Sequence, residues 1–96
     1  MNEPIEFVNI QDIINTFNMT IEQFEKLTTQ QWDILVYIYD FGSISPMEAF
    51  SQLGITKLST RISEMRMIGI QFDQAYEDST NRYGKKVRYM RYRKAA

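Results

Sequence analysis

The stretch from residue 43 to residue 69 decides the fold, and it reads SISPMEAFSQLGITKLSTRISEMRMIG. Its first part carries three agreeing signals for the start of a helix. Ser45 is a favoured N-cap residue, Pro46 suits the first helical position, and Glu48 is placed to complete a capping box. Gly54 is expected to end this helix, because glycine readily adopts the left-handed conformation found at helix ends.

A second helix is expected over residues 57–68, with Thr56 as its N-cap and Gly69 at its end. Two short helices joined by a glycine-containing turn predict a helix-turn-helix, in which the second helix is the recognition helix. The apolar face of the second helix follows the i, i+4, i+7 spacing and consists of Leu58, Ile62 and Met65. The apolar face of the first helix consists of Ala49, Phe50 and Leu53.

Further helices are predicted upstream of this motif. A helix starting near Asn9 has the apolar stripe of an amphipathic helix, and a capping box at Thr20 begins a segment that is either separate or a kinked continuation. A longer helix, capped by Thr28 or Thr29, ends at Gly42. It is apolar on two sides, so residues 1–27 or a dimer partner are expected to cover the side that the helix-turn-helix leaves open.

Downstream of Gly69 the apolar spacing changes from helical to alternating. Residues 70–76 and 87–93 are predicted strands, joined by a polar loop of about seven to nine residues that begins near residue 78. Three helices followed by a β-hairpin define a winged helix-turn-helix. The predicted fold is therefore α+β, mostly α: a three-helix core with a C-terminal hairpin wing (residues 28–96) and an extra N-terminal helical segment (residues 1–27).

The composition excludes several classes of function. Because the chain has no cysteine and no histidine, disulfides, zinc fingers and Cys or His nucleophiles are impossible. The adjacent carboxylates Glu77 and Asp78 lack further metal-ligating neighbours, and the glycines are isolated. We therefore expect a non-enzyme without cofactor or metal. No run of about 18 apolar residues is present, so we also expect a soluble, intracellular protein without a membrane partner.

Charge is divided unequally along the chain. Residues 1–56 contain one base and eight acids, a net −7, whereas residues 57–96 contain ten bases and four acids, a net +6, which together give −1. The basic part coincides with the second helix of the motif and the predicted wing. This asymmetry predicts that one face binds a polyanion, despite a sequence pI of about 5.4.

Residues 28–93 resemble the small winged helix-turn-helix proteins of bacteriophages and prophages of Gram-positive bacteria. The resemblance lies in the order TTQQWDIL, GSISPMEAF, LGITKLSTRISEMR and TNRYGKKVRYMRYR. It implies DNA binding in a phage or prophage setting, with a role in transcription regulation in the cytoplasm of the bacterial host. Residues 1–27 lie outside the resemblance.

The predicted function is therefore binding to double-stranded DNA. The recognition helix 57–68 is expected in the major groove, and the basic wing 78–94 on phosphates or in the minor groove. Arg61 is predicted either to form an ion pair with a nearby acid or to contact phosphate. The candidate DNA-binding residues are Lys57, Ser59, Thr60, Ser63 and Arg66 in the helix, and Arg82, Tyr83, Lys85, Lys86 and Arg88 in the wing.

Other readings of the same residues stay open. A winged helix can serve as a protein-protein interaction module without DNA binding, with the acidic N-terminal face as the contact. The acidic half could instead mimic a nucleic acid and block a basic site of a host protein. A homodimer that reads two half-sites is compatible with the DNA-binding prediction.

Overall fold

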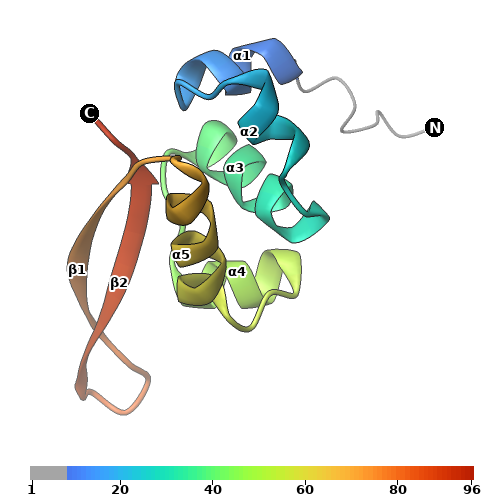
Figure 1. Ribbon diagram of the computed structural model, residues 1–96. Helices are drawn as coiled ribbons and strands as arrows, with labels where there is room; N and C mark the ends of the chain where they lie inside the picture. Colours follow the sequence, from blue (N-terminus) through green and yellow to red (C-terminus); the bar gives the residue numbers. More distant parts are fainter. Residues whose placement is uncertain (1–8) are drawn as a thin grey trace.

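A computed structural model describes residues 9–96, and in this range five helices precede a two-stranded antiparallel hairpin (Figure 1). The fold is the mostly helical winged helix-turn-helix predicted above, with extra helices before the three-helix core. None of its helices is long and apolar enough to cross a membrane. The elements are α1 (Ile10–Thr16), α2 (Ile21–Glu25), α3 (Thr29–Phe41), α4 (Pro46–Leu53), α5 (Leu58–Ile68), β1 (Phe72–Thr80) and β2 (Lys86–Lys94).

Capping boxes begin three of the helices. Thr20, Thr28 and Ser45 each accept a hydrogen bond from the backbone three residues later, and the side chain there bonds back to the cap. Pro46 occupies the first turn of α4, as expected. These helix starts are local in origin, which is why the sequence alone predicts them.

The start of α5 and one contact of α4 differ from the prediction. Thr56 does not cap α5: Lys57 is the N-cap and makes no side-chain cap bond. Burial of Ile55 and Leu58 on either side fixes this turn through packing instead. Phe50 was expected in the core but is 59% exposed, because α4 packs through the neighbouring small residue Ala49, which is fully buried.

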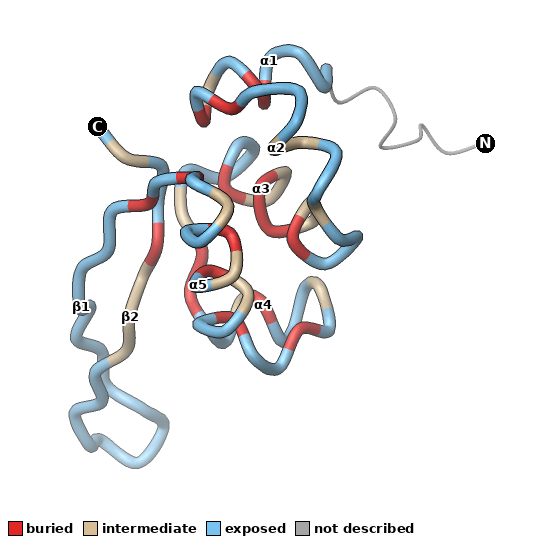
Figure 2. Tube along the Cα trace, viewed as in Figure 1, coloured by how far each residue is buried: buried red, intermediate tan, exposed pale blue. Residues whose placement is uncertain are grey.

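The N-terminal helices pack on the core within the same chain. Ile13 and Ile14 of α1 are buried in one cluster with residues of α3, α5 and the base of the hairpin (Figure 2). Asn18, with a positive φ of 55°, separates α1 from α2. The Gln23 side chain of α2 donates a hydrogen bond to the carbonyl of Ile68 at the end of α5 (3.1 Å). Residues 1–8, which belong to the predicted N-terminal segment, lie outside the described residues.

The hairpin is longer and its tip shorter than predicted. β1 pairs with β2 from Phe72 opposite Lys94 to Thr80 opposite Lys86, which leaves residues 81–85 as the tip. The expected polar loop starting near residue 78 was therefore wrong. Asp78 lies opposite Arg88 and forms an ion pair with it, and this cross-strand contact favours a strand although Asp is a poor strand former.

The base of the hairpin is fastened to the helices by β2. Ile44, in the segment between α3 and α4, exchanges two backbone hydrogen bonds with Tyr92 (2.9 Å each). The side chains of Tyr92 and Phe72 are buried beside them. The tip, in contrast, extends beyond the helices and is exposed (Figure 2). Arg88 of β2 is exposed as well.

One guanidinium joins the hairpin to the start of α4. Arg91 donates to both carboxylate oxygens of Glu48 (3.0 and 3.2 Å), to Glu77 (2.6 Å) and to Ser43 (2.9 Å), and only 19% of its side chain is exposed. Hydrogen bonding to Glu48 is the main reason why the pKa of Arg91 lies above its ordinary value. Because Glu48 also accepts from the Ser45 amide, Arg91 holds the capping box and both strands together.

Replacing Arg91 with Met should destabilise the protein by about 2 kcal/mol, because charge-assisted hydrogen bonds to two carboxylates are lost. Urea unfolding, followed by circular dichroism, measures this change. The matched control is Arg88→Met. Its ion pair with Asp78 is exposed, so its loss should lower the unfolding midpoint much less than the loss of Arg91. Equal midpoints for the two variants would contradict a special role for Arg91.

Candidate nucleic-acid interface

The N-terminal half of α5 presents small hydroxyl side chains to solvent. Its core side is formed by Leu58, Ile62 and Met65, which are buried against the other helices. The opposite side carries the predicted contacts Ser59, Thr60 and Ser63, all exposed, and exposed Lys57 precedes it. Small side chains near the start of a helix let its backbone approach closely to the floor of a groove.

The two arginines of α5 are both engaged within the protein. Arg61 forms a bidentate pair with Glu64 (2.8 and 2.9 Å), and Glu64 also accepts from Gln31 of α3 (3.0 Å). Arg61 was predicted either to form an ion pair or to contact phosphate, and the structure shows the ion pair. The bond from Gln31 places Glu64 against α3.

Arg66, a predicted DNA contact, links α5 to the hairpin. Its guanidinium donates to the carbonyl of Phe72 (3.1 Å) and to the side chain of Gln74 (2.7 Å), and it lies 6.0 Å from the centroid of the Tyr92 ring. The residue is exposed, so contact with a phosphate stays a prediction. Its observed role is to fix the angle between the recognition helix and the wing.

The tip of the hairpin and the first residue of β2 carry three cations without an acidic partner, and Arg93 and Lys94 at the base are likewise outside the ion pairs of residues 9–96. Arg82, Lys85 and Lys86 are exposed, and none forms an ion pair with another of residues 9–96. Asn81 orders the turn between them: its side-chain oxygen accepts from the amides of Tyr83 (2.9 Å) and Lys85 (3.1 Å). Gly84 supplies the positive φ of 80° that this turn requires.

The remaining two wing residues predicted to contact DNA differ from each other. Arg88 is exposed but pairs with Asp78 (3.0 Å) and lies over the Tyr76 ring, so much of its charge is compensated within the hairpin. Tyr83 is 78% exposed at the tip. It therefore presents an aromatic ring beside the unpaired cations, whereas the ring of Tyr92 is buried in the core.

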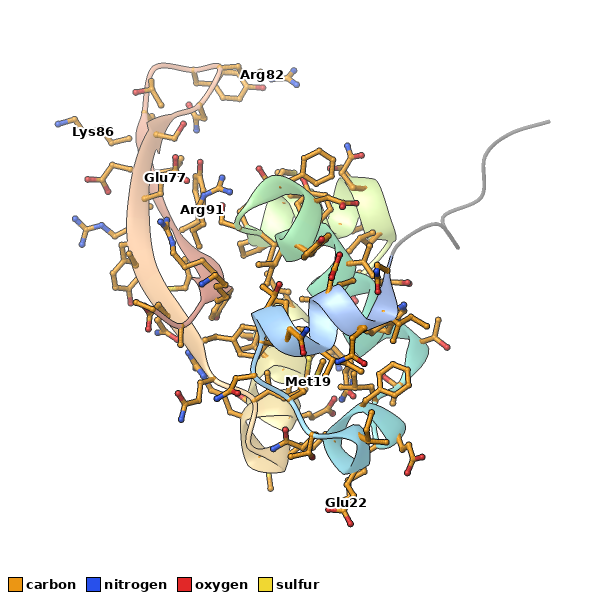
Figure 3. The ribbon with its side chains drawn as sticks, turned by 90° about the horizontal axis from the view of Figure 1, so that it is seen from above. Met19, Glu22, Glu77, Arg82, Lys86 and Arg91 are labelled. Atoms are coloured by element: carbon orange, nitrogen blue, oxygen red, sulfur yellow. The ribbon has the colours of Figure 1, made fainter. Side chains whose placement is uncertain are left out.

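The basic hairpin tip and the acidic N-terminal helices lie at opposite ends of the folded protein. The hairpin tip extends past the helices at one end of the molecule, while α1 and α2 lie at the other end (Figure 1). Figure 3 shows Arg82 and Lys86 at the far end of the hairpin from the helices, pointing in different directions, with Glu22 of α2 at the opposite end of the view. A polyanion bound at the tip is thus kept away from the acidic N-terminal helices.

Two features of this site were missed by sequence reasoning. No structural role was predicted for Arg91. Its pairing with Glu48 becomes evident only when the hairpin is docked against the start of α4. The function of Asn81 as organiser of the tip was also missed. The sequence did contain a signal for it, because an Asn side chain in a turn often accepts a hydrogen bond from the backbone amide two residues later.

A match to a known family agrees with this geometry. Residues 29–93, well over half of the chain, match the model of the winged helix-turn-helix domain. The chain belongs to this family, and membership supports a DNA-binding role in general. No curated protein and no solved structure matches the chain.

Within residues 9–96, no group of three or more acidic side chains is arranged to hold a metal ion.

Replacing Asn81 with Ala should loosen the hairpin tip without unfolding the hairpin, because two amides lose their common acceptor. Backbone order parameters from ¹⁵N relaxation should fall at residues 83–85, toward the values of about 0.6 or less that mark flexible loops. Ser79→Ala, an exposed change on the adjacent strand, is the control and should leave them unchanged. Order parameters that stay at the native values in the Asn81 variant would contradict this role.

Proposed function

We propose that this protein binds double-stranded DNA as a transcription regulator, with the start of α5 in the major groove and the hairpin tip on the backbone and in the minor groove. The observation that carries the proposal is the pattern of charge pairing in the wing. Arg88 and Arg91 are neutralised by acids of the protein, whereas Arg82, Lys85 and Lys86 are held unpaired on an ordered tip.

The proposal includes the biological setting that the sequence resemblance implies. The protein would act in the cytoplasm of a bacterial host as the product of a phage or prophage, by occupying DNA and without catalysing a reaction. Two copies could bind neighbouring half-sites.

The recognition helix itself offers little means of reading bases. The side chains that make bidentate contacts to base edges are Arg, Lys, Asn and Gln, each worth about 1–3 kcal/mol of discrimination. α5 contains no Asn or Gln, and both of its arginines are engaged within the protein. Apart from Lys57, the helix presents the hydroxyls of Ser59, Thr60 and Ser63, which bond to any base.

Discrimination between sequences would then fall mainly to the tip. A·T-rich DNA has a narrow minor groove with an enhanced negative potential, which favours an inserted arginine. Arg82 is the unpaired arginine at the tip, and the ordered turn reduces the entropy lost when it inserts. We therefore propose a preference for A·T-rich duplexes.

The electrostatic part of the proposal is tested by the salt dependence of binding. The proposed interface contains four unpaired cations, Lys57, Arg82, Lys85 and Lys86, which should give a slope of log K against log salt of about −3.6. Replacing Lys86 with Ala should make that slope less steep by about 0.9. Both slopes are measured by fluorescence anisotropy of a labelled mixed-sequence duplex at salt concentrations between about 50 and 200 mM.

The control for this experiment is Lys26→Ala, which removes one positive charge from the end of α2. It should leave the slope unchanged, since Lys26 belongs to the acidic half. Absence of binding to any duplex at low salt would refute the proposed function.

Base analogues separate readout in the two grooves. An inosine·cytosine pair has the minor groove of A·T, because it lacks the guanine amino group, and the major groove of G·C. If Arg82 reads the minor groove, an inosine duplex should bind like an A·T duplex and roughly tenfold tighter than a G·C duplex, or about 1.4 kcal/mol.

The matched variant is Arg82→Lys, which keeps the charge but should reduce this preference, since a narrow groove favours Arg. Inosine duplexes that bind like G·C would show that α5 reads the bases from the major groove and would refute the role of the tip.

A further inference from the structure

A groove unrelated to the candidate DNA interface lies between α3 and the C-terminal end of α4. Its volume is about 300 Å³, and its apolar lining comes from Trp32, Val36, Phe41 and Leu53. Phe41 is 70% exposed, although the helix that contains it was expected to be covered on both apolar sides. The side of α3 that forms the groove is therefore an apolar helix face that α1 and α5 leave uncovered.

Two acids line the same groove. Asp33 and Asp40 lie seven residues apart on α3, two helical turns or about 10 Å along its axis. Neither forms an ion pair with another of residues 9–96. Burial raises the pKa of the Asp33 carboxyl, so its charge is poorly solvated where it stands. A partly buried carboxylate without a cation is unfavourable for folding and becomes favourable when a cation is supplied.

Charge decides which occupant fits. DNA would be repelled by the two carboxylates. A second copy in a two-fold symmetric contact would place the same acids against each other, and like charges across an interface cost several kcal/mol. An apolar groove with acids two turns apart is complementary to a helix with apolar residues on one face and basic residues at the same spacing.

We propose that this groove docks a basic amphipathic helix of a partner protein. Leu- or Phe-type side chains at positions i+3 and i+4 would fill the space beside Trp32 and Leu53. Lys or Arg at positions i and i+7 would pair with Asp33 and Asp40. This surface goes beyond DNA binding and would give the protein a second, independent partner.

Docking at the groove leaves the candidate DNA interface accessible. The wing and the groove use opposite ends of α4: Glu48 at its start holds Arg91 of the hairpin, whereas Leu53 at its end lines the groove. No residue predicted to contact DNA, in α5 or in the wing, lines the groove. A partner helix and a DNA duplex could therefore be bound at the same time.

Trp32 makes the proposal directly measurable, because it is the only tryptophan of the chain and lines the groove. The probe is a synthetic amphipathic peptide of about 14 residues, four helical turns, with Leu at i+3 and i+4 and Lys at i and i+7. Its twin has Glu in place of the two Lys. Titrated into the full chain at low salt, the Lys peptide should change the Trp32 emission saturably. The Glu twin should bind at least about tenfold more weakly.

Variants assign the charge preference to the two acids. The double variant Asp33→Asn, Asp40→Asn should bind both peptides equally, because the carboxylates that discriminate between them are gone. The matched control Glu22→Gln, Glu25→Gln removes the same charge from exposed positions on α2 and should keep the preference. Thermal unfolding confirms that each variant is folded.

Three results would overturn the proposal. The first is no change in Trp32 emission with the Lys peptide up to about 1 mM, the limit of weak binding. The second is equal binding of the two peptides to the native chain. The third is a dimer in sedimentation that Phe41→Glu dissociates, which would identify the groove as a contact between two copies. None of these results depends on whether the protein binds DNA.

Discussion

The contact between Arg91 and Glu48 determines how the hairpin is presented. Glu48 caps α4 through the Ser45 amide and accepts two bonds from Arg91, whose remaining donors reach Glu77 and Ser43. The first helix of the motif and both strands of the wing thereby meet at one guanidinium. Arg66 adds a second link, from α5 to β1, so the angle between recognition helix and wing is fixed from two sides. A rigid angle is what a two-groove contact with a duplex requires.

Intramolecular pairing sorts the bases of the C-terminal half into two groups. Arg61, Arg66, Arg88 and Arg91 are engaged with acceptors of the protein. Arg61 pairs within α5, whereas the other three hold one element against another or one strand against its neighbour. The four lysines of this half, Arg82 and Arg93 have no such partner among the described residues. These six bases, and not all ten, are the groups that are free to release counterions from DNA.

The features predicted correctly from the sequence are those with local causes. Capping boxes at Thr20, Thr28 and Ser45 depend on residues three positions apart, and the family match agrees with the predicted winged helix. The errors have distant causes. The strand continued through Asp78 because its partner is Arg88 across the hairpin, and Phe50 is exposed because α4 packs through Ala49. Likewise, only the docked hairpin distinguishes Arg66 and Arg88, which have internal partners, from Arg82, which has none among residues 9–96.

The ionic contacts at the hairpin base and the free cations at its tip share one chemical property. They consist of guanidinium, ammonium and carboxylate groups, whose ordinary pKa values lie near 4 or above about 10. The sequence contains no histidine and no cysteine to titrate between them. The side chain that most often acts as a pH switch near neutrality is therefore absent from the sequence. Ionic strength is the solution condition to which the exposed tip responds most, because the Arg91 pairs at the base are partly buried and therefore screened less by salt.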